Sequence, residues 1–459
     1  MNKKSLMKLV YILGDIFFVN IAFATSFLIR FGELPENNFA AYTELIPYIS
    51  LFTVIIFYLY NLYSNLFNRE KSEMMYSIIP ISIFIASFTA ILSYYAYQFA
   101  FPRSVILMSI PVMFSFLIIW RYGMLFLEKR LVKSRRVIII GGEIENTRLL
   151  DNINKRTNSN YEIVSIIIKE GDIYIKTDNE NDEQNNNKKI YNSIEVLEND
   201  LRVMKPDLLF ITPGLTEEEK KYLTYLSLEE SWQMSLVPDL YEIMLSSAEL
   251  QHIGELPIFE MNTMHTDSNE VIKRIVDISL SSILLIICFP LMLVTAIAIK
   301  LDSHGSIFFR QKRISKNGKT FEVFKFRTMV NNAEKKTGPV LASQNDNRIT
   351  NLGNILRKTR IDEIPQLINV LKGDMSLIGP RPERPYFVNK FEDNIPEYKY
   401  RHKMKSGITG LAQVYGYYST KPEDKLRMDF LYAHKTSFVF DLKIMLHTVK
   451  VMLMKDKSS

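Results

Sequence analysis

The stretch IVDISLSSILLIICFPLMLVTAIAI, residues 275–299, decides the fold class of this chain of 459 residues. It is apolar over more than the ~20 residues that cross roughly 30 Å of hydrocarbon. Lys273 and Arg274 precede it and Lys300 follows it, so the flanking charge assigns no direction across a membrane. Pro290 removes a backbone donor inside the run and predicts a bend there. The run predicts either a helix that enters and leaves a membrane on one face, or a kinked span.

Four more apolar runs of spanning length lie upstream, at residues 9–29, 45–66, 78–99 and 105–126. Residues 1–127 accordingly contain only 14 of the 106 charged residues of the chain. Lys and Arg gather before the first run, between the second and third, and after the fourth, where we count Arg121 with the basic linker. By the positive-inside rule, both ends of these four spans are cytoplasmic. An even number of spans keeps the following chain in the cytoplasm, which favours re-entry of residues 275–299.

Composition excludes several other classes of protein. The chain is 47% hydrophobic and 12% aromatic, which excludes simple disorder. Cys288 is the single cysteine, so neither a disulfide-stapled secreted fold nor a multi-cysteine metal site is available. Asp15 lies inside the first apolar run, where a carboxylate is costly. It predicts a functional group or, as the alternative, an interhelical hydrogen bond or a protonated acid near the interface.

Residues 131–265 read as a separate α/β domain. An apolar strand runs from Arg136 into Gly141 and Gly142, and strand candidates recur at 163–168 and 208–212 with helical stretches nearby. This alternation predicts a Rossmann-like sheet. The first turn lacks the later glycines of the G-x-G-x-x-G fingerprint, which argues against a dinucleotide site and against a nicotinamide-dependent epimerase. We therefore expect a structural or regulatory domain.

Residues 356–366, LRKTRIDEIPQ, carry the strongest chemical signal. Pro365 fits the first turn of a helix that runs to residue 371 or 372 and stops at Gly373. Asp362 and Glu363 then lie just ahead of a helix N-terminus, where ionised carboxylates and phosphate groups are both favoured. Being adjacent, they point in different directions and suit separate roles, one as a nucleophile and the other as a metal ligand or base. Helix capping is the alternative explanation.

Basic residues in the same third of the chain fit a phosphate site. Residues 300–360 hold 14 Lys or Arg against four acidic residues, a surplus that suits anionic lipid or a pyrophosphate. Lys325 and Arg327 alternate with aromatic residues, as on a strand with one cationic face. Arg381 lies between Pro380 and Pro382, which fix its backbone and suit it to bind a phosphoryl group; a plain structural loop is the alternative. A solvated basic surface is the alternative for the charge surplus.

The order of these motifs resembles the bacterial sugar transferase family, the large monotopic phosphoglycosyl transferases that begin exopolysaccharide and O-antigen assembly. The resemblance covers about residues 270–455 strongly and the rest of the chain more weakly. It rests on FRQKR at 309–313, KFRTM at 325–329, DEIPQ at 362–366, residues 372–382, and GITGLAQ at 407–413.

The resemblance implies a reaction and its residues. Asp362 would attack the sugar-bearing phosphorus of a UDP-sugar, releasing UMP and leaving a phosphosugar–aspartate intermediate that undecaprenyl phosphate resolves. Glu363 would help to bind Mg²⁺. Arg357 and Arg381 would hold phosphate groups with Lys325 and Arg327 nearby. Pro290 would mark the break of the re-entrant helix. The segment at 411–416 departs from the family pattern, so the sugar stays open.

Taken together, the sequence predicts a membrane protein of α and α/β class, located in the bacterial cytoplasmic (inner) membrane with its catalytic domain on the cytoplasmic face. It would comprise a four-helix transmembrane bundle (1–130), a Rossmann-like domain (131–265), a re-entrant membrane helix (270–300) and a small, mostly helical α/β catalytic domain (301–459). The expected partners are a UDP-sugar, undecaprenyl phosphate and membrane lipid. A homodimer is left open, and no nucleic acid is expected. The alternative function is a non-catalytic membrane scaffold or regulator of polysaccharide export.

Overall fold

The chain folds into two compact units, Met1–Asp239 and Leu240–Ser459. The sequence placed the end of the middle domain near residue 265, whereas the structure groups residues from Leu240 onward with the second unit. This computed structural model describes residues 3–64, 71–97, 102–131, 133–154, 160–177, 189–246, 248–261, 267–330, 346, 348–416 and 420–454.

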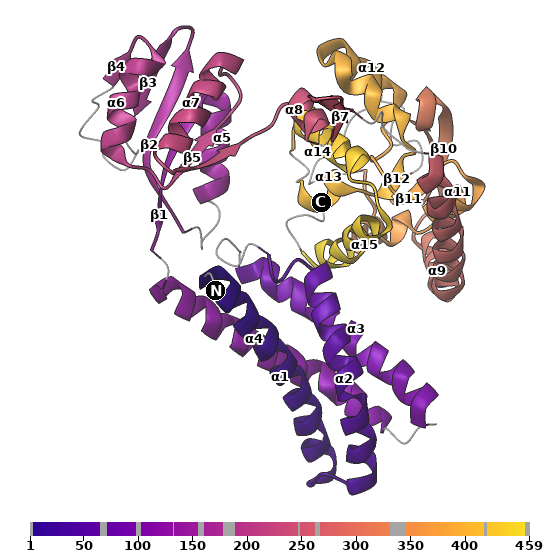
Figure 1. The fold of residues 1–459 in the computed structure, drawn as a ribbon. Coiled ribbons are helices and arrows are strands. Elements are labelled where there is room, and N and C mark those ends of the chain that lie inside the picture. Colours follow the sequence, from indigo (N-terminus) through magenta and orange to yellow (C-terminus); the bar gives the residue numbers. More distant parts are fainter. Residues whose placement is uncertain are drawn as a thin grey trace. The chain divides into compact units, whose positions relative to one another are not determined.

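Five helices in the described part of the chain are long and apolar enough to cross a membrane. Four of them lie in the first unit and coincide with the four predicted runs. In this group α1 contacts α2 and α4, and α3 contacts the same two helices (Figure 1). Their bounds are α1 Lys3–Phe31, α2 Glu36–Leu59, α3 Lys71–Tyr97 and α4 Arg103–Leu131.

A buried ion pair joins α1 to α4. Arg121 lies within α4 and not in the basic linker where the sequence placed it, which corrects the count of charges after the fourth run. Its Nε and Nη2 atoms lie 3.1 and 2.5 Å from the two carboxylate oxygens of Asp15, and its Nη1 donates to the carbonyl of Leu62 at 3.2 Å. Both side chains are almost completely buried. Each charge is therefore paired as charges at membrane depth usually are, which confirms an interhelical hydrogen bond for Asp15.

A six-stranded sheet with the order β4-β3-β2-β1-β5-β6 forms the rest of the first unit. Strands β2, β1, β5 and β6 are parallel, and β3 and β4 add antiparallel strands at one edge. On β1, Ile138 and Ile140 pack with α6 and α7, while Val137 and Ile139 pack with α5 (Figure 1). Burial on both faces explains its unbroken apolar sequence. The bounds are β1 Arg135–Gly141, α5 Glu143–Asn154, β2 Tyr161–Glu170, β3 Ile173–Thr177, β4 Lys189–Tyr191, α6 Ile194–Met204, β5 Leu208–Ile211, α7 Glu217–Glu229 and β6 Gln233–Leu236.

The first turn of this sheet is filled by protein backbone. The amide of Gly142, which a pyrophosphate would need in a dinucleotide site, donates to the carbonyl of Pro213 at 2.9 Å. A Cβ atom on Gly141 would lie 2.1 Å from the Thr212 hydroxyl, so only glycine allows this approach. Gly141 and Gly142 therefore allow the end of β1 to pack closely against the turn that follows β5.

The second unit holds the remaining elements. Their bounds are α8 Leu240–Leu245, β7 Glu249–Ile253, β8 Leu256–Glu260, α9 Asp267–Asp302, β9 Phe308–Ile314, η1 Lys316–Gly318, β10 Thr320–Phe326, α10 Asn351–Lys358, η2 Ile361–Glu363, α11 Gln366–Lys372, β11 Ser376–Ile378, α12 Pro385–Asn394, η3 Pro396–Lys403, β12 Gly407–Thr409, α13 Leu411–Tyr415, α14 Pro422–His434 and α15 Phe438–Leu453. Three short two-stranded sheets, β9–β10, β11–β12 and β7–β8, accompany the helices (Figure 1). One apolar core joins β10, α11, β11, α14 and α15.

Helix α9, the fifth apolar run, contacts the rest of the second unit near both of its ends. Near its start, Arg274 donates to the carbonyls of Val370 and Leu371 at 2.6 and 2.8 Å. Near its end, Ile299 is buried in a cluster with residues of β10 and α10. The helix continues through Pro290 without interruption, so the predicted break is not a gap in the helix. Apolar side chains such as Ile286 and Val294 remain exposed, which leaves a face for lipid.

Candidate active site

The two predicted carboxylates lie in a tight turn between α10 and α11. Arg360 adopts a left-handed conformation with φ of 56°, and the 3-10 helix η2 follows directly. A non-glycine residue in this region is uncommon and is often found at functional sites. Helix α11 then begins at Gln366 and ends before Gly373, which has φ of 89°, as predicted. The turn buries both Asp362 and Glu363, which retain only 8% and 9% exposure.

Glu363 is surrounded by cations from three parts of the chain. Its Oε1 atom lies 2.6 Å from Nζ of Lys325 on β10 and 2.9 Å from Nη2 of Arg381. Its Oε2 atom lies 4.0 Å from Arg360. Burial alone would raise the pKa of Glu363, but Arg381 and Lys325 outweigh it and hold that pKa well below its usual range. Glu363 is therefore an ionised carboxylate already shared between two cations.

Asp362 has a different electrostatic environment. Burial and the neighbouring charge of Glu363 raise the pKa of Asp362 to about 6, against the opposing charges of Lys325, Arg357 and Arg381. Among the described residues, the ion pairs of this turn are all formed by Glu363, and the carboxylate oxygens of Asp362 take part in none. The adjacent acids are thus distinct, one fixed by cations and the other poised to titrate near neutral pH.

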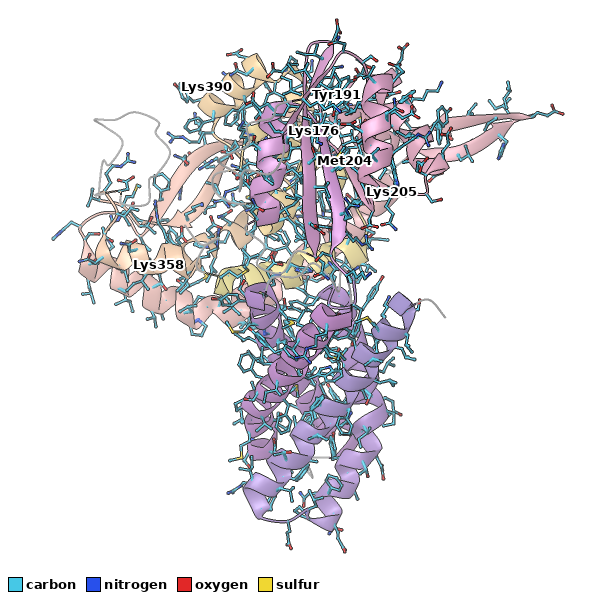
Figure 2. The ribbon with its side chains drawn as sticks, turned by 90° about the vertical axis from the view of Figure 1, so that its left-hand side faces the viewer. Lys176, Tyr191, Met204, Lys205, Lys358 and Lys390 are labelled. Atoms are coloured by element: carbon cyan, nitrogen blue, oxygen red, sulfur yellow. The ribbon has the colours of Figure 1, made fainter. Side chains whose placement is uncertain are left out.

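Arg357 reaches the site from the last turn of α10. Its Nε atom donates to the hydroxyl of Thr328 at 2.9 Å, which leaves the terminal guanidinium nitrogens for other acceptors. Arg357 is half-buried, whereas the next residue, Lys358, is exposed (Figure 2). Gly353 lets α10 approach this closely, because a Cβ there would lie 2.1 Å from the carbonyl oxygen of Thr328.

Arg327, unlike the other predicted cations, contacts the chain after α9 instead of the carboxylates. Its guanidinium donates to the carbonyls of Ser303 and His304 at 2.8 and 3.2 Å, and to the Ser303 hydroxyl at 2.8 Å. These contacts anchor the chain just beyond α9. The structure therefore brings Lys325, Arg357 and Arg381 to the carboxylates and directs Arg327 toward the membrane helix. Sequence reasoning missed Arg360, although it belongs to the basic run that drew attention to the site.

Asn369 fixes α11 beside β10 and so brings Lys325 to Glu363. This fully buried side chain accepts from the amide of Phe324 at 2.9 Å and donates to the carbonyl of Glu322 at 2.7 Å. The side-chain amide of Asn369 thereby takes the place of a neighbouring strand and satisfies one backbone N–H and one backbone C=O at the open edge of β10. The helix that directly follows the acids and the strand that carries Lys325 are thereby held together.

The chemistry of these donors fits one divalent cation held together with a substrate. Among the described residues, no group of three or more His, Cys, Asp or Glu side chains is close enough to hold a metal ion by itself. Mg²⁺ is usually held by one or two carboxylates and completed by substrate phosphates and water. Asp362 and Glu363 are the carboxylates here that could hold such a cation, and for Glu363 it would be through Oε2, since Oε1 is paired with Lys325 and Arg381.

The site lies in a part of the chain that is similar to known proteins. The family model described as bacterial sugar transferase matches residues 268–455, which include every residue of the site. The chain is 45% identical over 185 residues to the UDP-N-acetylgalactosamine-undecaprenyl-phosphate N-acetylgalactosaminephosphotransferase of Aeromonas hydrophila, covering 40% of this chain and 44% of that protein. It is 36% identical over 235 residues to the UDP-glucose:undecaprenyl-phosphate glucose-1-phosphate transferase of Escherichia coli K12, covering 50% of each.

A shorter relative is matched over nearly its whole length. The exopolysaccharide production protein PSS of Rhizobium leguminosarum bv. phaseoli is 40% identical over 195 residues, covering 41% of this chain and 98% of that protein. By contrast, the matched part spans only about half the length of the Aeromonas and Escherichia proteins. The part of the chain that the family model matches, residues 268–455, holds nearly all of α9 and the carboxylate pair.

Proposed function

Because this chain belongs to the bacterial sugar transferase family, we propose that it transfers a sugar 1-phosphate from a UDP-sugar to undecaprenyl phosphate and releases UMP. The names of the Aeromonas and Escherichia relatives describe reactions of this class. The observation that carries the proposal is the buried Asp362–Glu363 pair with Lys325, Arg357 and Arg381 around it. We place the reaction at the first membrane step of surface polysaccharide synthesis, for exopolysaccharide or O-antigen.

Asp362 is the nucleophile in this proposal. A carboxylate oxygen attacks the phosphorus that bears the sugar, the bond from that phosphorus to the UMP oxygen breaks, and UMP leaves with the electron pair. A phosphate oxygen of undecaprenyl phosphate then attacks the same phosphorus. The bond to Asp362 breaks, the carboxylate is regenerated, and undecaprenyl-diphospho-sugar is released. The free oxygens of Asp362, beside a Glu363 whose Oε1 atom is paired with Lys325 and Arg381, support this division of roles.

The cations around the pair supply the remaining requirement, since phosphoryl transfer depends mainly on positioning and on positive charge. Arg357 and Arg381 would hold phosphate oxygens, and Lys325 would stabilise charge on the group that leaves. Glu363 is the residue that would hold Mg²⁺ together with the pyrophosphate. When bound, the metal neutralises the pyrophosphate and stabilises the departing nucleotide.

The wild-type reaction is tested in membranes with a panel of radiolabelled UDP-sugars, undecaprenyl phosphate and Mg²⁺. The proposal expects UMP release and transfer of label into the lipid extract with at least one sugar. If no UDP-sugar yields labelled lipid while glycan export still depends on this protein, the scaffold alternative replaces it.

We further propose that α9 is re-entrant, with the catalytic domain on the cytoplasmic face of the inner membrane. The contacts of Arg274 and Ile299 support this, because they attach the start and end of one apolar helix to the same compact unit. A helix that crossed the bilayer would carry those two ends to opposite faces.

Cysteine labelling in intact cells tests this topology. After Cys288 is replaced by serine, Asn317→Cys in the exposed turn after β9 is expected to react with a membrane-impermeant maleimide only once cells are permeabilised. Glu33→Cys, in the connection between α1 and α2, is the control and should react in intact cells. Labelling of Asn317→Cys from outside would show that α9 crosses the membrane.

The pKa of Asp362 predicts how the reaction depends on pH. Because that pKa is raised to about 6, the nucleophilic form is lost as the pH falls through this value. We expect kcat/KM for UMP release to fall about tenfold per pH unit below pH 6. Glu363 stays ionised there, since its pKa is well below the usual range. A profile that stays flat down to pH 5 would remove Asp362 from the nucleophile's role.

A further inference from the structure

The segment that carries Arg381 is held almost entirely through its carbonyl groups. Pro380 and Pro382 have no amide hydrogen, so the usual backbone donors are missing on both sides of Arg381. At the ends of the segment, the carbonyl of Pro380 accepts from an amide of β12 and that of Glu383 accepts from an amide of β9. The two acceptors between them are instead reached by side chains.

Arg401 is the side chain that reaches the carbonyl of Arg381. Its Nη2 atom donates to that oxygen at 3.1 Å, although the two residues are 20 positions apart. The same nitrogen lies 2.9 Å from Oδ2 of Asp429 on α14, and Nη1 donates to the hydroxyl of Tyr398. Arg401 and Asp429 are nearly inaccessible, with 4% and 2% exposure. A buried guanidinium that donates to two fixed acceptors and is paired with a carboxylate has little freedom to move.

Arg313 holds the neighbouring peptide in the same way. Its Nη1 atom donates to the carbonyl of Pro382 at 3.1 Å and lies 3.5 Å from a carboxylate oxygen of Glu383. The guanidinium groups of Arg401 and Arg313 thus donate to the consecutive carbonyls of Arg381 and Pro382. Charge-assisted hydrogen bonds of this kind are stronger and more directional than neutral ones, especially where water is excluded.

We propose that Arg401, itself oriented by Asp429, is a positioning residue for Arg381. Arg401 fixes the peptide plane after Arg381. It thereby fixes the position of the Arg381 guanidinium relative to Glu363 and, when a nucleoside diphosphate is bound, relative to its phosphates. The inference rests on the proposed function, in which Arg381 is a phosphate ligand. Arg401 does not touch the carboxylates itself, so its effect on phosphate binding passes through Arg381.

A double-mutant cycle on the full-length, detergent-solubilised protein separates this role from a purely structural one. UDP with Mg²⁺ is the probe, and its Kd is measured by calorimetry alongside the unfolding midpoint. Arg401 and Asp429 are replaced together, as R401M with D429L, because removing one partner would leave a buried charge unpaired. Arg381→Ala and the triple variant complete the cycle. Lys273 and Asp441, another ion pair of this unit at 2.8 Å, are replaced in the same way as the matched control.

We expect Arg381→Ala to weaken UDP binding about tenfold or more, as for loss of a charged hydrogen-bonding partner. The R401M/D429L variant should weaken it about three- to tenfold, and the triple variant should bind no more weakly than Arg381→Ala. The control pair should leave the Kd unchanged. Non-additivity is the signature of positioning, because a residue that acts only through Arg381 has no effect once Arg381 is gone.

Arg401→Lys provides a second route if the paired variant fails to fold. Lysine keeps a positive charge beside Asp429 but lacks the fork that serves several acceptors at once. It should weaken UDP binding about threefold or more with little change in unfolding midpoint. Wild-type affinity in a folded Arg401 variant, or additive losses in the triple variant, would overturn the positioning role. If UDP does not bind the wild-type protein, the proposed function fails and this inference fails with it.

Discussion

Replacement of Asp362 by asparagine is expected to abolish UMP release, lowering its rate by about 10⁴-fold or more. Asparagine keeps the size of the side chain and its hydrogen-bonding oxygen but is not a nucleophile toward phosphorus. The measurement is release of radiolabelled UMP in single-turnover reactions with the wild-type and variant proteins. Because the first half-reaction does not need the lipid acceptor, the loss should be as large without undecaprenyl phosphate.

The same substitution is expected to keep or raise the stability of the fold. The pKa of Asp362 is raised to about 6 by burial, so the folded state disfavours its ionised form. Above pH 6 the ionised carboxylate therefore opposes folding, and a neutral amide removes that opposition. The unfolding midpoint at pH 8 should be unchanged or higher in Asp362→Asn. UMP release that survives in the folded variant would contradict the assigned nucleophile.

Replacement of Glu363 by glutamine is expected to have the opposite effect on stability. The pKa of Glu363 is well below its usual range, so its charge stabilises the folded state above the unfolded pKa, and this stabilisation is lost as the pH falls. Glutamine removes the counter-charge that Lys325 and Arg381 share at 2.6 and 2.9 Å. Breaking a buried pair from one side costs about 3 kcal/mol, so the unfolding midpoint should fall by about 5–10 °C at pH 8.

Glu363→Gln should also lower the rate of UMP release by about 10²- to 10³-fold and raise the Mg²⁺ concentration needed for half-maximal rate. Titration of Mg²⁺ at saturating UDP-sugar measures this. The control is Glu322→Gln on β10, an exposed carboxylate 4.0 Å from Arg310, which should change neither quantity. An unaltered Mg²⁺ dependence in a folded Glu363→Gln protein would separate this residue from the metal.

Local sequence was sufficient for the parts of the site that depend on short-range chemistry. Pro365 and Gly373 predict the bounds of α11, and the acids ahead of Pro365 fall in the turn where they were expected. The parts that depend on long-range packing could not be predicted this way. Arg327 and Lys325 are only two residues apart, Lys325 on β10 and Arg327 directly after it, yet Arg327 donates to the chain after α9 and Lys325 pairs with Glu363.

The role of Arg401 is a second feature that depends on long-range packing and could not be predicted from the local sequence. In sequence it is one of several basic residues in the stretch PEYKYRHK, with nothing to distinguish it from its neighbours. Only the packing of η3 against α14 brings it to Asp429 and to the carbonyl of Arg381. Arg121 was misplaced for a related reason, because a cation near the end of an apolar run is indistinguishable from a loop charge until its partner Asp15 is known.

The pair formed by Asp15 and Arg121 has a consequence for how the protein is made. Its two residues are 106 positions apart in the chain, so α1 is synthesised well before α4. An unpaired carboxylate at helix centre costs roughly 2.5–3.5 kcal/mol to insert. Until α4 supplies the guanidinium, nascent α1 therefore carries this cost without compensation. The ion pair of this anchor is completed only by its last helix, and truncation before α4 would make the insertion of α1 less favourable by about that cost.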